Sequence, residues 1–239
     1  MKNLNIAAMI LIIGISAGYV SCKGTILPIK GNGNLVTTER AVSSFRKINI
    51  SGSAEVRFHE SQEYRAVITV DSNLDEYAEV FTRDDVLNIE TESGNYLFTK
   101  YLVDVYCPAL AGVSISGSGH FSGNDTIITS TFDSNVSGSG KIDGTIECDN
   151  FFTKISGSGK VTITGNCKDS SIDISGSGNF NGNEFAINNA VVHISGSGKV
   201  NICVTDNLKA NISGSGELNY RGEPKIDSSV SGSGRIKKI

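Results

Sequence analysis

The sequence predicts an all-β fold, a coil of stacked short strands. Three observations support it: a repeated tetrad, apolar positions on either side of the tetrad, and a high glycine content. The tetrad Ser-Gly-Ser-Gly recurs every 18 to 21 residues in the second half of the chain. A short fixed period is typical of repeat folds in which each unit buries its apolar side against its neighbours. The seven copies begin at Ser116, Ser137, Ser156, Ser175, Ser195, Ser213 and Ser231.

The residues that flank the tetrad have the period of a β-strand. The position directly before it is Ile or Val in every copy, and the second position after it is always apolar. The position between the tetrad and that second apolar residue is polar. Such alternation predicts strands with one buried face, and the many β-branched residues agree. Because the period is too short for a propeller blade or a helix pair, we predict parallel strands stacked as a β-helix.

The tetrad itself is interpreted as an element of shape. With the preceding Ile or Val pointing inward, strict alternation places both glycines inward and both serines outward, where the hydroxyls form ladders. A phosphate-binding loop needs a following helix and a Lys-Ser/Thr pair, which the repeats lack. A serine nucleophile is equally unsupported, because the same serine occurs in seven copies.

Composition excludes several classes of protein. The chain has 239 residues with 27 Gly, no Trp and 3 Pro, and its 38% hydrophobic residues are too many for a disordered chain. The formal net charge is −4, so we expect no nucleic-acid partner. Paired Cys/His spacings are missing, so we expect neither a metal site nor a cofactor.

The N-terminus has the features of an export signal. Lys2 precedes a nearly uncharged apolar run that is shorter than a membrane-spanning helix requires, and Ser21 precedes Cys22. A small residue followed by Cys resembles the bacterial lipobox. We therefore predict a lipoprotein held in the outer membrane by lipid on Cys22, facing the periplasm or the exterior. The lipobox usually has Leu where this chain has Tyr19, so ordinary signal-peptide cleavage stays open, as does a short anchor or buried helix.

Three segments follow from these features: a lipoprotein signal peptide at 1–21, a flexible glycine-containing tether at 22–40, and a β-helix domain at 41–239. Within the domain, residues 111–239 hold the seven rungs. Residues 41–110 lack the tetrad apart from a degenerate SGSA copy at Ser51, yet their apolar residues still alternate. We interpret them as further rungs, or as a β-rich cap that covers the first open edge of the coil.

Four cysteines lie in the domain: Cys107, Cys148, Cys167 and Cys203. Cys148 and Cys167 each lie eight residues before the next tetrad, so we expect them to stack on neighbouring rungs about 4.8 Å apart. Cys203 lies ten residues before its tetrad, where other copies have Ile or Phe, and is expected to fill the core. Free thiols are the favoured interpretation, and a Cys148–Cys167 disulfide stays open.

Several segments resemble the GIN domain, the head domain of an auto-transporter adhesin family of exported Bacteroidetes proteins. The resemblance covers residues 41–239 and rests on FRKINISGSAEVRF, VDVYCPALAGVSISGSG, the ISGSGKV units and LNYRGEPKIDSSVSGSG. It implies a right-handed parallel β-helix of 18 to 21 residues per rung with a divergent N-terminal part. It implies neither catalytic residues nor an established activity.

The first functional hypothesis is a non-enzymatic adhesin of the envelope, or a module that binds glycan or a surface protein. Its candidate site is the outward column directly after the tetrad, whose cations would attract an acidic polysaccharide. The alternative interpretation of this column is a solvated face that keeps the coil soluble. The basic members of the column are His120, Lys141, Lys160, Lys199 and Arg235.

Two other functions compete with this one. A polysaccharide lyase or hydrolase is suggested by analogy with β-helices that cleave pectin-like polymers. Such enzymes need two facing carboxylates, or a carboxylate cluster with a base, whereas only Asp143 is acidic in the outward column three places after the tetrad. We therefore expect no catalytic residues. The third hypothesis is polymerisation through the coil ends, which the Lys-rich RIKKI end disfavours.

Overall fold

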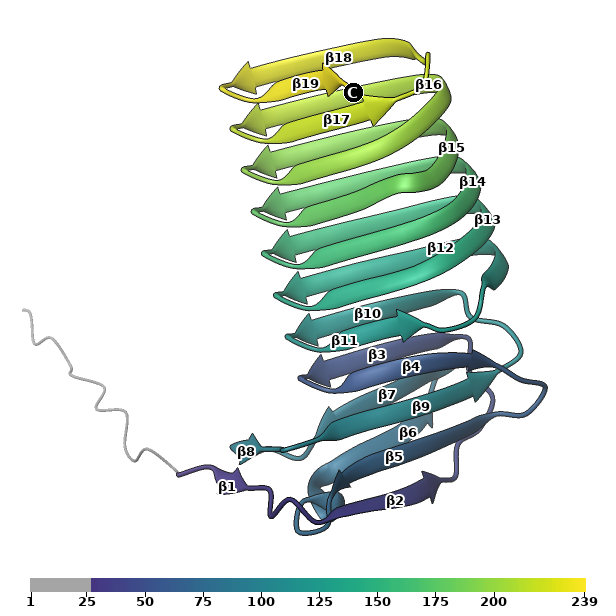
Figure 1. Ribbon diagram of the computed structural model, residues 1–239, viewed down its shortest axis with the longest axis vertical. Helices are drawn as coiled ribbons and strands as arrows, with labels where there is room; N and C mark the ends of the chain where they lie inside the picture. The colour runs from purple at the N-terminus through teal and green to yellow at the C-terminus, as the bar shows by residue number, and fades with distance from the viewer. Residues whose placement is uncertain (1–26) are drawn as a thin grey trace, which may run out of the picture.

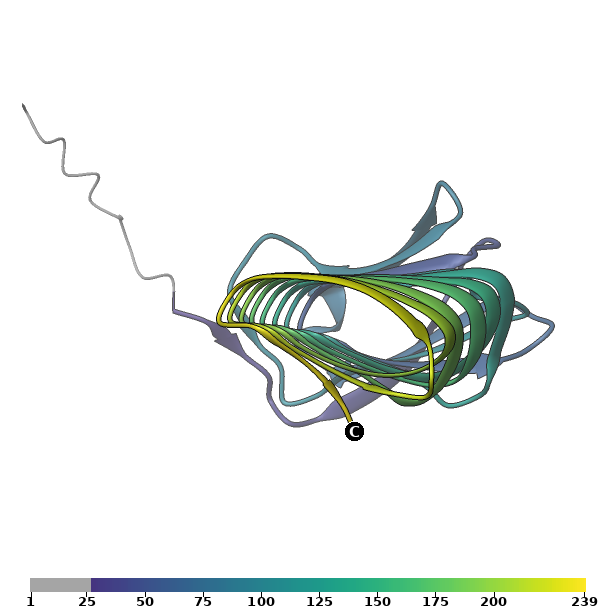
Figure 2. The same cartoon turned by 90° about the horizontal axis from the view of Figure 1, so that it is seen from above.

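The strands of residues 27–239, the part of the chain that the computed structural model describes, wind into a coil of stacked turns (Figure 1). Seen from the C-terminal end, the chain runs counterclockwise as it approaches the viewer, so the coil is right-handed (Figure 2). Its one helical element is the 3-10 turn η1 (Asp75–Tyr77), and no helix among the described residues could span a membrane. The predicted β-helix is confirmed. The predicted signal peptide and Cys22 lie outside the described residues.

Each turn of the coil has two walls that meet at the tetrad. The residues that lead into the tetrad form what we call the serine wall, and those that follow it form the basic wall. From β13 to β16 a single bent strand supplies both walls of a turn. The strands of the repeat are β10 (Gly112–Gly117), β11 (His120–Gly123), β12 (Ile127–Gly138), β13 (Lys141–Gly157), β14 (Lys160–Gly176), β15 (Asn179–Gly196), β16 (Lys199–Gly214), β17 (Glu217–Arg221), β18 (Lys225–Gly232) and β19 (Arg235–Lys238).

The tetrads stack in register at the narrow end of the cross-section, on the left in Figure 2. The apolar residue before each tetrad, such as Ile155, and the second residue after it, such as Val161, are fully or almost fully buried. Only in the last rung do the same columns lose this burial: Val230 is exposed and Ile236 is partly buried. The core is therefore a stack of like side chains, as the sequence predicts.

The tetrad forms a corner in which its two glycines have different roles. The first glycine of each copy faces solvent with a positive φ of 107° to 121°. A Cβ there would meet the glycine below, as at Gly157, where it would lie 2.7 Å from the Gly138 carbonyl oxygen. Only the second glycine is buried, and a Cβ at Gly178 would lie 2.4 Å from Ile155 Cγ2. The prediction that both glycines point inward is wrong, because the positive φ at the first interrupts the strand alternation.

The SGSA copy forms one further rung directly beneath the SGSG rungs. β3 (Lys47–Gly52), which contains Ser51, pairs in parallel with β10, and β4 (Glu55–Glu60) pairs in parallel with β11. Residues 41–110 were interpreted as further rungs or as a cap, and the structure contains both: one further rung and a cap. The cap strands are β5 (Arg65–Asp71), β6 (Ala78–Arg83), β7 (Val86–Thr91), β8 (Tyr96–Leu97) and β9 (Tyr101–Cys107).

The cap continues both walls and changes the direction of pairing. β7 is parallel to β3 and antiparallel to β6, while β9 is parallel to β4 and antiparallel to β5. β2 (Leu35–Arg40) is antiparallel to β5, and β1 (Ile29–Lys30) pairs with β8. The prediction of a flexible tether is wrong for these strands. The buried Asp71 carboxylate holds the segment between them, accepting hydrogen bonds from Gly33 N at 2.8 Å and Thr99 Oγ1 at 2.5 Å.

The register predicted for Cys148 and Cys167 is confirmed, and the position predicted for Cys203 is wrong. Cys148 and Cys167 are direct partners on neighbouring rungs, and the four cysteines of residues 27–239 are free thiols. Cys203 lies outside the core and is half-buried, so the prediction that it fills the core is wrong. Irregular pairing of β15 with β16 shifts Cys203 beside Ala186, and Val204 takes the inward position.

Candidate functional site

The basic column predicted from the sequence stacks on the basic wall, but its charges are partly neutralised. His120, Lys141 and Lys160 are neighbours in register. His120 Nε2 lies 2.8 Å from Asp143 Oδ2, and Lys199 Nζ lies 3.1 Å from Glu217 Oε1. Hydrogen bonds from Asn219 and Lys199 lower the pKa of Glu217, an acidic member of the same column. The column is thus a mixture of charges.

The serine wall presents two polar columns side by side. The first, the serine ladder, contains the first serine of each tetrad, from Ser51 to Ser231. The second, which we call the groove column, lies two residues earlier on each strand and is polar in every rung. Its members, in stacking order, are Asn49, Ser114, Asn135, Lys154, Asp173, His193, Asn211 and Ser229.

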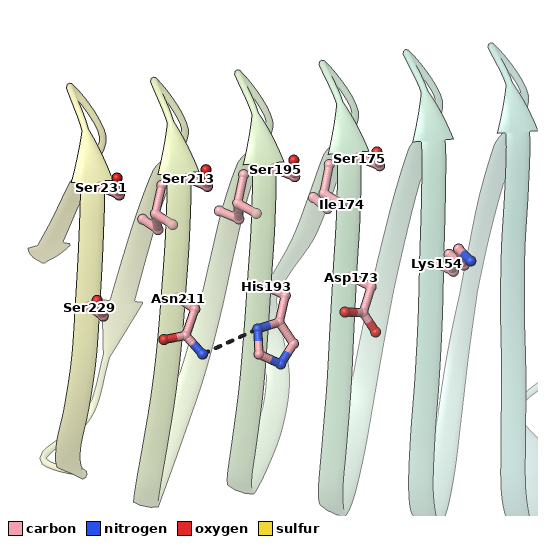
Figure 3. A pocket seen from close by; sticks show the side chains of 12 residues that line it. Lys154, Asp173, Ile174, Ser175, His193, Ser195, Asn211, Ser213, Ser229 and Ser231 are labelled. Carbon is pink, nitrogen blue, oxygen red and sulfur yellow. Dashed lines mark hydrogen bonds between the residues drawn. The ribbon is translucent and has the colours of Figure 1, made fainter.

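These columns line a groove that crosses the strands along the coil axis. Its largest hollow has a volume of about 740 Å³ and extends from Lys154 to Ser231 (Figure 3). A second hollow of about 370 Å³ shares Lys154 with it, and a third of about 380 Å³ shares Asn49 with the second. The eight rungs of the groove column span about 34 Å at the usual strand spacing. The groove therefore has the length and direction to hold an extended ligand.

The centre of the groove carries three ionisable side chains on successive rungs. Lys154, Asp173 and His193 are direct neighbours in register and lie side by side in Figure 3. Within residues 27–239, no ion pair joins Lys154 to Asp173. Asp173 accepts a long 3.5 Å hydrogen bond from Ser171, and Asn211 Nδ2 donates to His193 Nδ1 at 3.3 Å. Most of the polar atoms of this trio thus stay available to a ligand.

An exposed aromatic side chain lies beside the groove. Phe152 precedes Lys154 by two residues on β13, so both side chains face solvent on the serine wall. Phe152 is 46% exposed, whereas the isoleucines under the groove, such as Ile174 and Ile194, are 2% exposed. Side chains with polar groups therefore lie above a buried apolar layer, and Phe152 lies on the same wall outside the lining.

The groove was not predicted from the sequence, because the basic residues directly after the tetrad are conspicuous and the groove residues are not. The groove column has no shared residue type, so it shows no repeat of its own. Its signal is that the position before the buried Ile or Val is polar in all eight rungs. Metal chemistry finds no support in the described residues, where no three His, Cys, Asp or Glu side chains converge.

Fold and groove together define a class of protein, a right-handed parallel β-solenoid with a polar groove along one wall. The chain belongs to the family described as "Putative auto-transporter adhesin, head GIN domain", which matches residues 44–224. The resemblance drawn from the sequence is confirmed. No curated protein matches the chain.

Three crystal structures share the fold. A "putative adhesin" from Bacteroides fragilis is 23% identical with a TM-score of 0.82, and the match covers 88% of this chain and 100% of that chain. A "putative adhesin" from Parabacteroides distasonis is 28% identical with a TM-score of 0.73, over 88% and 99% of the two chains. A "putative lipid binding protein" from Parabacteroides distasonis is 27% identical with a TM-score of 0.75, over 89% and 99%.

Proposed function

We propose that this protein is a non-enzymatic adhesin of the cell envelope that holds an extended ligand in the groove of the serine wall. The observation that carries the proposal is the alignment of three hollows along the eight rungs of one wall. Adhesion by a solenoid depends on many weak contacts repeated along its axis, and the two polar columns supply a contact at each rung. The adhesin descriptions of the family and of two related structures support the same role.

The groove is a better candidate than the basic column. On the basic wall, His120 and Lys199 are already engaged by acids, so an anionic ligand that binds at these two residues must break the pairs. Within residues 27–239, Lys141 and Lys160 form no ion pair, so these two cations of the column remain for a ligand. In the groove, Lys154 and Asp173 have no such partner to give up. We therefore move the candidate site from the basic column to the opposite wall.

A lipid ligand fits the groove poorly. One relative is described as lipid binding, but the isoleucines beneath this groove are buried and most of the residues that line it are Ser, Asn or ionisable. Lipid pockets are largely apolar. A polar polymer is the ligand that this surface favours.

Catalysis is not part of the proposal. Asp173 is the one carboxylate that lines the largest hollow, whereas glycoside hydrolysis needs two carboxylates across the scissile bond. We expect incubation with polygalacturonate, alginate and neutral polysaccharides to yield neither unsaturated products nor new reducing ends. Release of either product at enzyme-dependent rates would contradict the non-enzymatic assignment.

The adhesion test compares the same substitution on the two walls. The mature full chain is immobilised on beads, and binding of the beads to mucus and to bacterial cell surfaces is counted. Ser195→Arg places a long cation in the serine ladder, and Asn179→Arg places one in the outward column of the basic wall. We expect Ser195→Arg to reduce binding at least about tenfold and Asn179→Arg to leave it unchanged. Equal binding by both variants would contradict the groove as the adhesion site.

Anchoring is proposed through lipid on Cys22, as the lipobox-like sequence suggests. Mass spectrometry of the cell-derived protein should show an acylated Cys22 as the mature N-terminus. Cys22→Ala should release the protein from the membrane fraction. An unmodified, cleaved N-terminus would support ordinary export instead, and protease shaving of intact cells would establish whether the domain faces the periplasm or the exterior.

A further inference from the structure

We infer that the ligand of the groove is a neutral polysaccharide that lies along the coil axis with one sugar ring on Phe152. The inference rests on the proposed function and adds the chemical class of the ligand. It depends on the direction of the groove, the chemistry of its walls and the position of one aromatic ring.

The direction of the groove disfavours an extended peptide. Peptides that bind to β-structure commonly add a strand at a free edge, where backbone N–H and C=O groups are unpaired. Except for β18, which pairs with β16 alone at the end of the coil, the strands under this groove pair with a neighbour on each side; β14, for example, pairs with β13 and with β15. Recognition in the groove must therefore come from side chains. Ile174, Ile194 and Ile212 line the largest hollow but are each 2% exposed, so they offer little surface on which peptide side chains could anchor.

The polar groups of the groove match hydroxyl groups. Serine hydroxyls and asparagine amides both donate and accept hydrogen bonds, and a sugar hydroxyl does the same. The serine ladder repeats one such group at each rung, about 4.8 Å apart. A polymer of repeated polyhydroxylated units can therefore make the same contact many times along the axis.

The charges of the groove favour a neutral polymer. Lys154 and Asp173 carry opposite charges on adjacent rungs and cancel within the largest hollow. Asp173 would repel a polyanion, and Lys154 would repel a polycation. We therefore infer a neutral polymer, whereas the basic column suggested an acidic polysaccharide.

Phe152 supplies the apolar contact that sugar rings need. One face of a pyranose ring is formed by C–H groups, and covering it with an aromatic ring removes apolar surface from water. Phe152 is exposed and lies on the same face of β13 as Lys154 and Ser156, two residues before Lys154, which lines both of the neighbouring hollows. Among the described residues of this part of the serine wall, Phe152 is the exposed phenylalanine, and the other aromatic ring is the imidazole of His193.

The experiment measures affinity of the mature full chain for named polymers by gel retardation and calorimetry. The neutral probes are β-glucan, mannan and galactomannan, and the acidic probes are polygalacturonate and alginate. We expect at least one neutral probe to bind and both acidic probes to fail. Phe152→Ala should weaken binding at least about tenfold, and Phe152→Tyr should restore it to within about twofold.

The matched control is Ile128→Ala, which removes the most exposed large aliphatic side chain of the repeat strands, 69% exposed, at a position away from the groove lining. It should bind like the wild type. Binding of acidic probes alone, binding of none of the probes, or an unchanged affinity in Phe152→Ala would overturn the inference. The two proposals fail separately. If Ser195→Arg abolishes adhesion while neutral probes neither bind nor compete, the groove is the site and the polysaccharide assignment is wrong. If Ser195→Arg and Asn179→Arg adhere equally, the groove itself is not the adhesion site.

Discussion

The two walls of the solenoid are built from the same repeat, yet their outward columns differ in how the side chains are used. On the basic wall, His120 and Lys199 are paired with acids of adjacent rungs. On the serine wall, Lys154, Asp173 and His193 lie on successive rungs without an ion pair among the described residues. The pairs on the basic wall satisfy two charges within the protein, and the three side chains of the groove leave polar atoms for a ligand. The serine wall also has an ion pair, between Lys47 and Asp133. The repeat thus determines where the side chains lie, and the residues on adjacent rungs determine whether those side chains can still bind a ligand.

Substitution at the corner that joins the two walls should cause the largest change in the free energy of unfolding. Gly178→Ala places a Cβ 2.4 Å from Ile155 Cγ2, so the rung below must move, and we expect a loss of about 3 kcal/mol in the free energy of unfolding. Gly144→Ala is the control, because its Cβ would have no neighbour closer than 3.8 Å. Urea denaturation measures both variants. Equal stability of the two would show that the corner tolerates side chains.

The outer end of the basic wall should show the next largest effect. Asp71 is buried, which by itself raises its pKa, but hydrogen bonds from Thr99 and Gly33 outweigh burial and lower the pKa. The stabilisation by the Asp71 carboxylate is therefore present at neutral pH. It is lost as the pH falls below about 3.9, the ordinary pKa of an aspartate, towards the lower pKa of the folded state. We expect Asp71→Ala to cost about 2 kcal/mol at pH 7 and less at pH 3. A cost that does not depend on pH would assign the effect to packing alone.

A buried hydroxyl between the walls should give a smaller effect of opposite sign. Ser170 is 5% exposed, and its Oγ has no hydrogen-bond partner in the described structure; its neighbours in register are Phe151 and Ala190. Replacing it removes an unsatisfied polar group, so Ser170→Ala should raise the free energy of unfolding by about 1 kcal/mol. The exposed Ser156→Ala should change nothing. A destabilised Ser170→Ala would point to a bound water at Oγ.

Removal of an outward charge should cause the smallest change in the free energy of unfolding, and the change should differ between the two walls. Lys199→Gln removes an exposed ion pair with Glu217, so we expect a loss of about 0.5 kcal/mol at low salt that vanishes at high salt. Lys154→Gln should have no effect on stability in either condition, since no ion pair is lost. Denaturation of both variants with and without added salt tests the contrast. A salt-dependent loss in Lys154→Gln would show that the groove charges are engaged within the protein.

The regular part of the fold could be predicted because the tetrad reports register directly. Spacing alone placed Cys148 beside Cys167, and the apolar columns before and after the tetrad identified the core. Cys203 was misplaced because irregular pairing near Gly182 is invisible in a count of residues. The first glycine of the tetrad was misplaced because a positive φ is a property of the corner, which strict alternation ignores.

The candidate site was harder to predict than the fold. Basic residues on the column after the tetrad are conspicuous in the sequence, but their neutralisation by Asp143 and Glu217 depends on contacts between rungs. The groove column contains serine, asparagine, lysine, aspartate and histidine, so no composition marks it. Only the stacked register brings Lys154, Asp173 and His193 together.

The most direct test of the serine wall as the binding surface is lysine footprinting of a single rung. Lys154 and Lys160 are both exposed and only six residues apart, but they face solvent on opposite walls. The protein is acetylated with and without bound neutral polysaccharide, and modification of each lysine is measured by mass spectrometry. The serine-wall site predicts severalfold protection of Lys154 and unchanged reactivity of Lys160. Protection of Lys160 with Lys154 unchanged would contradict it and return the site to the basic wall.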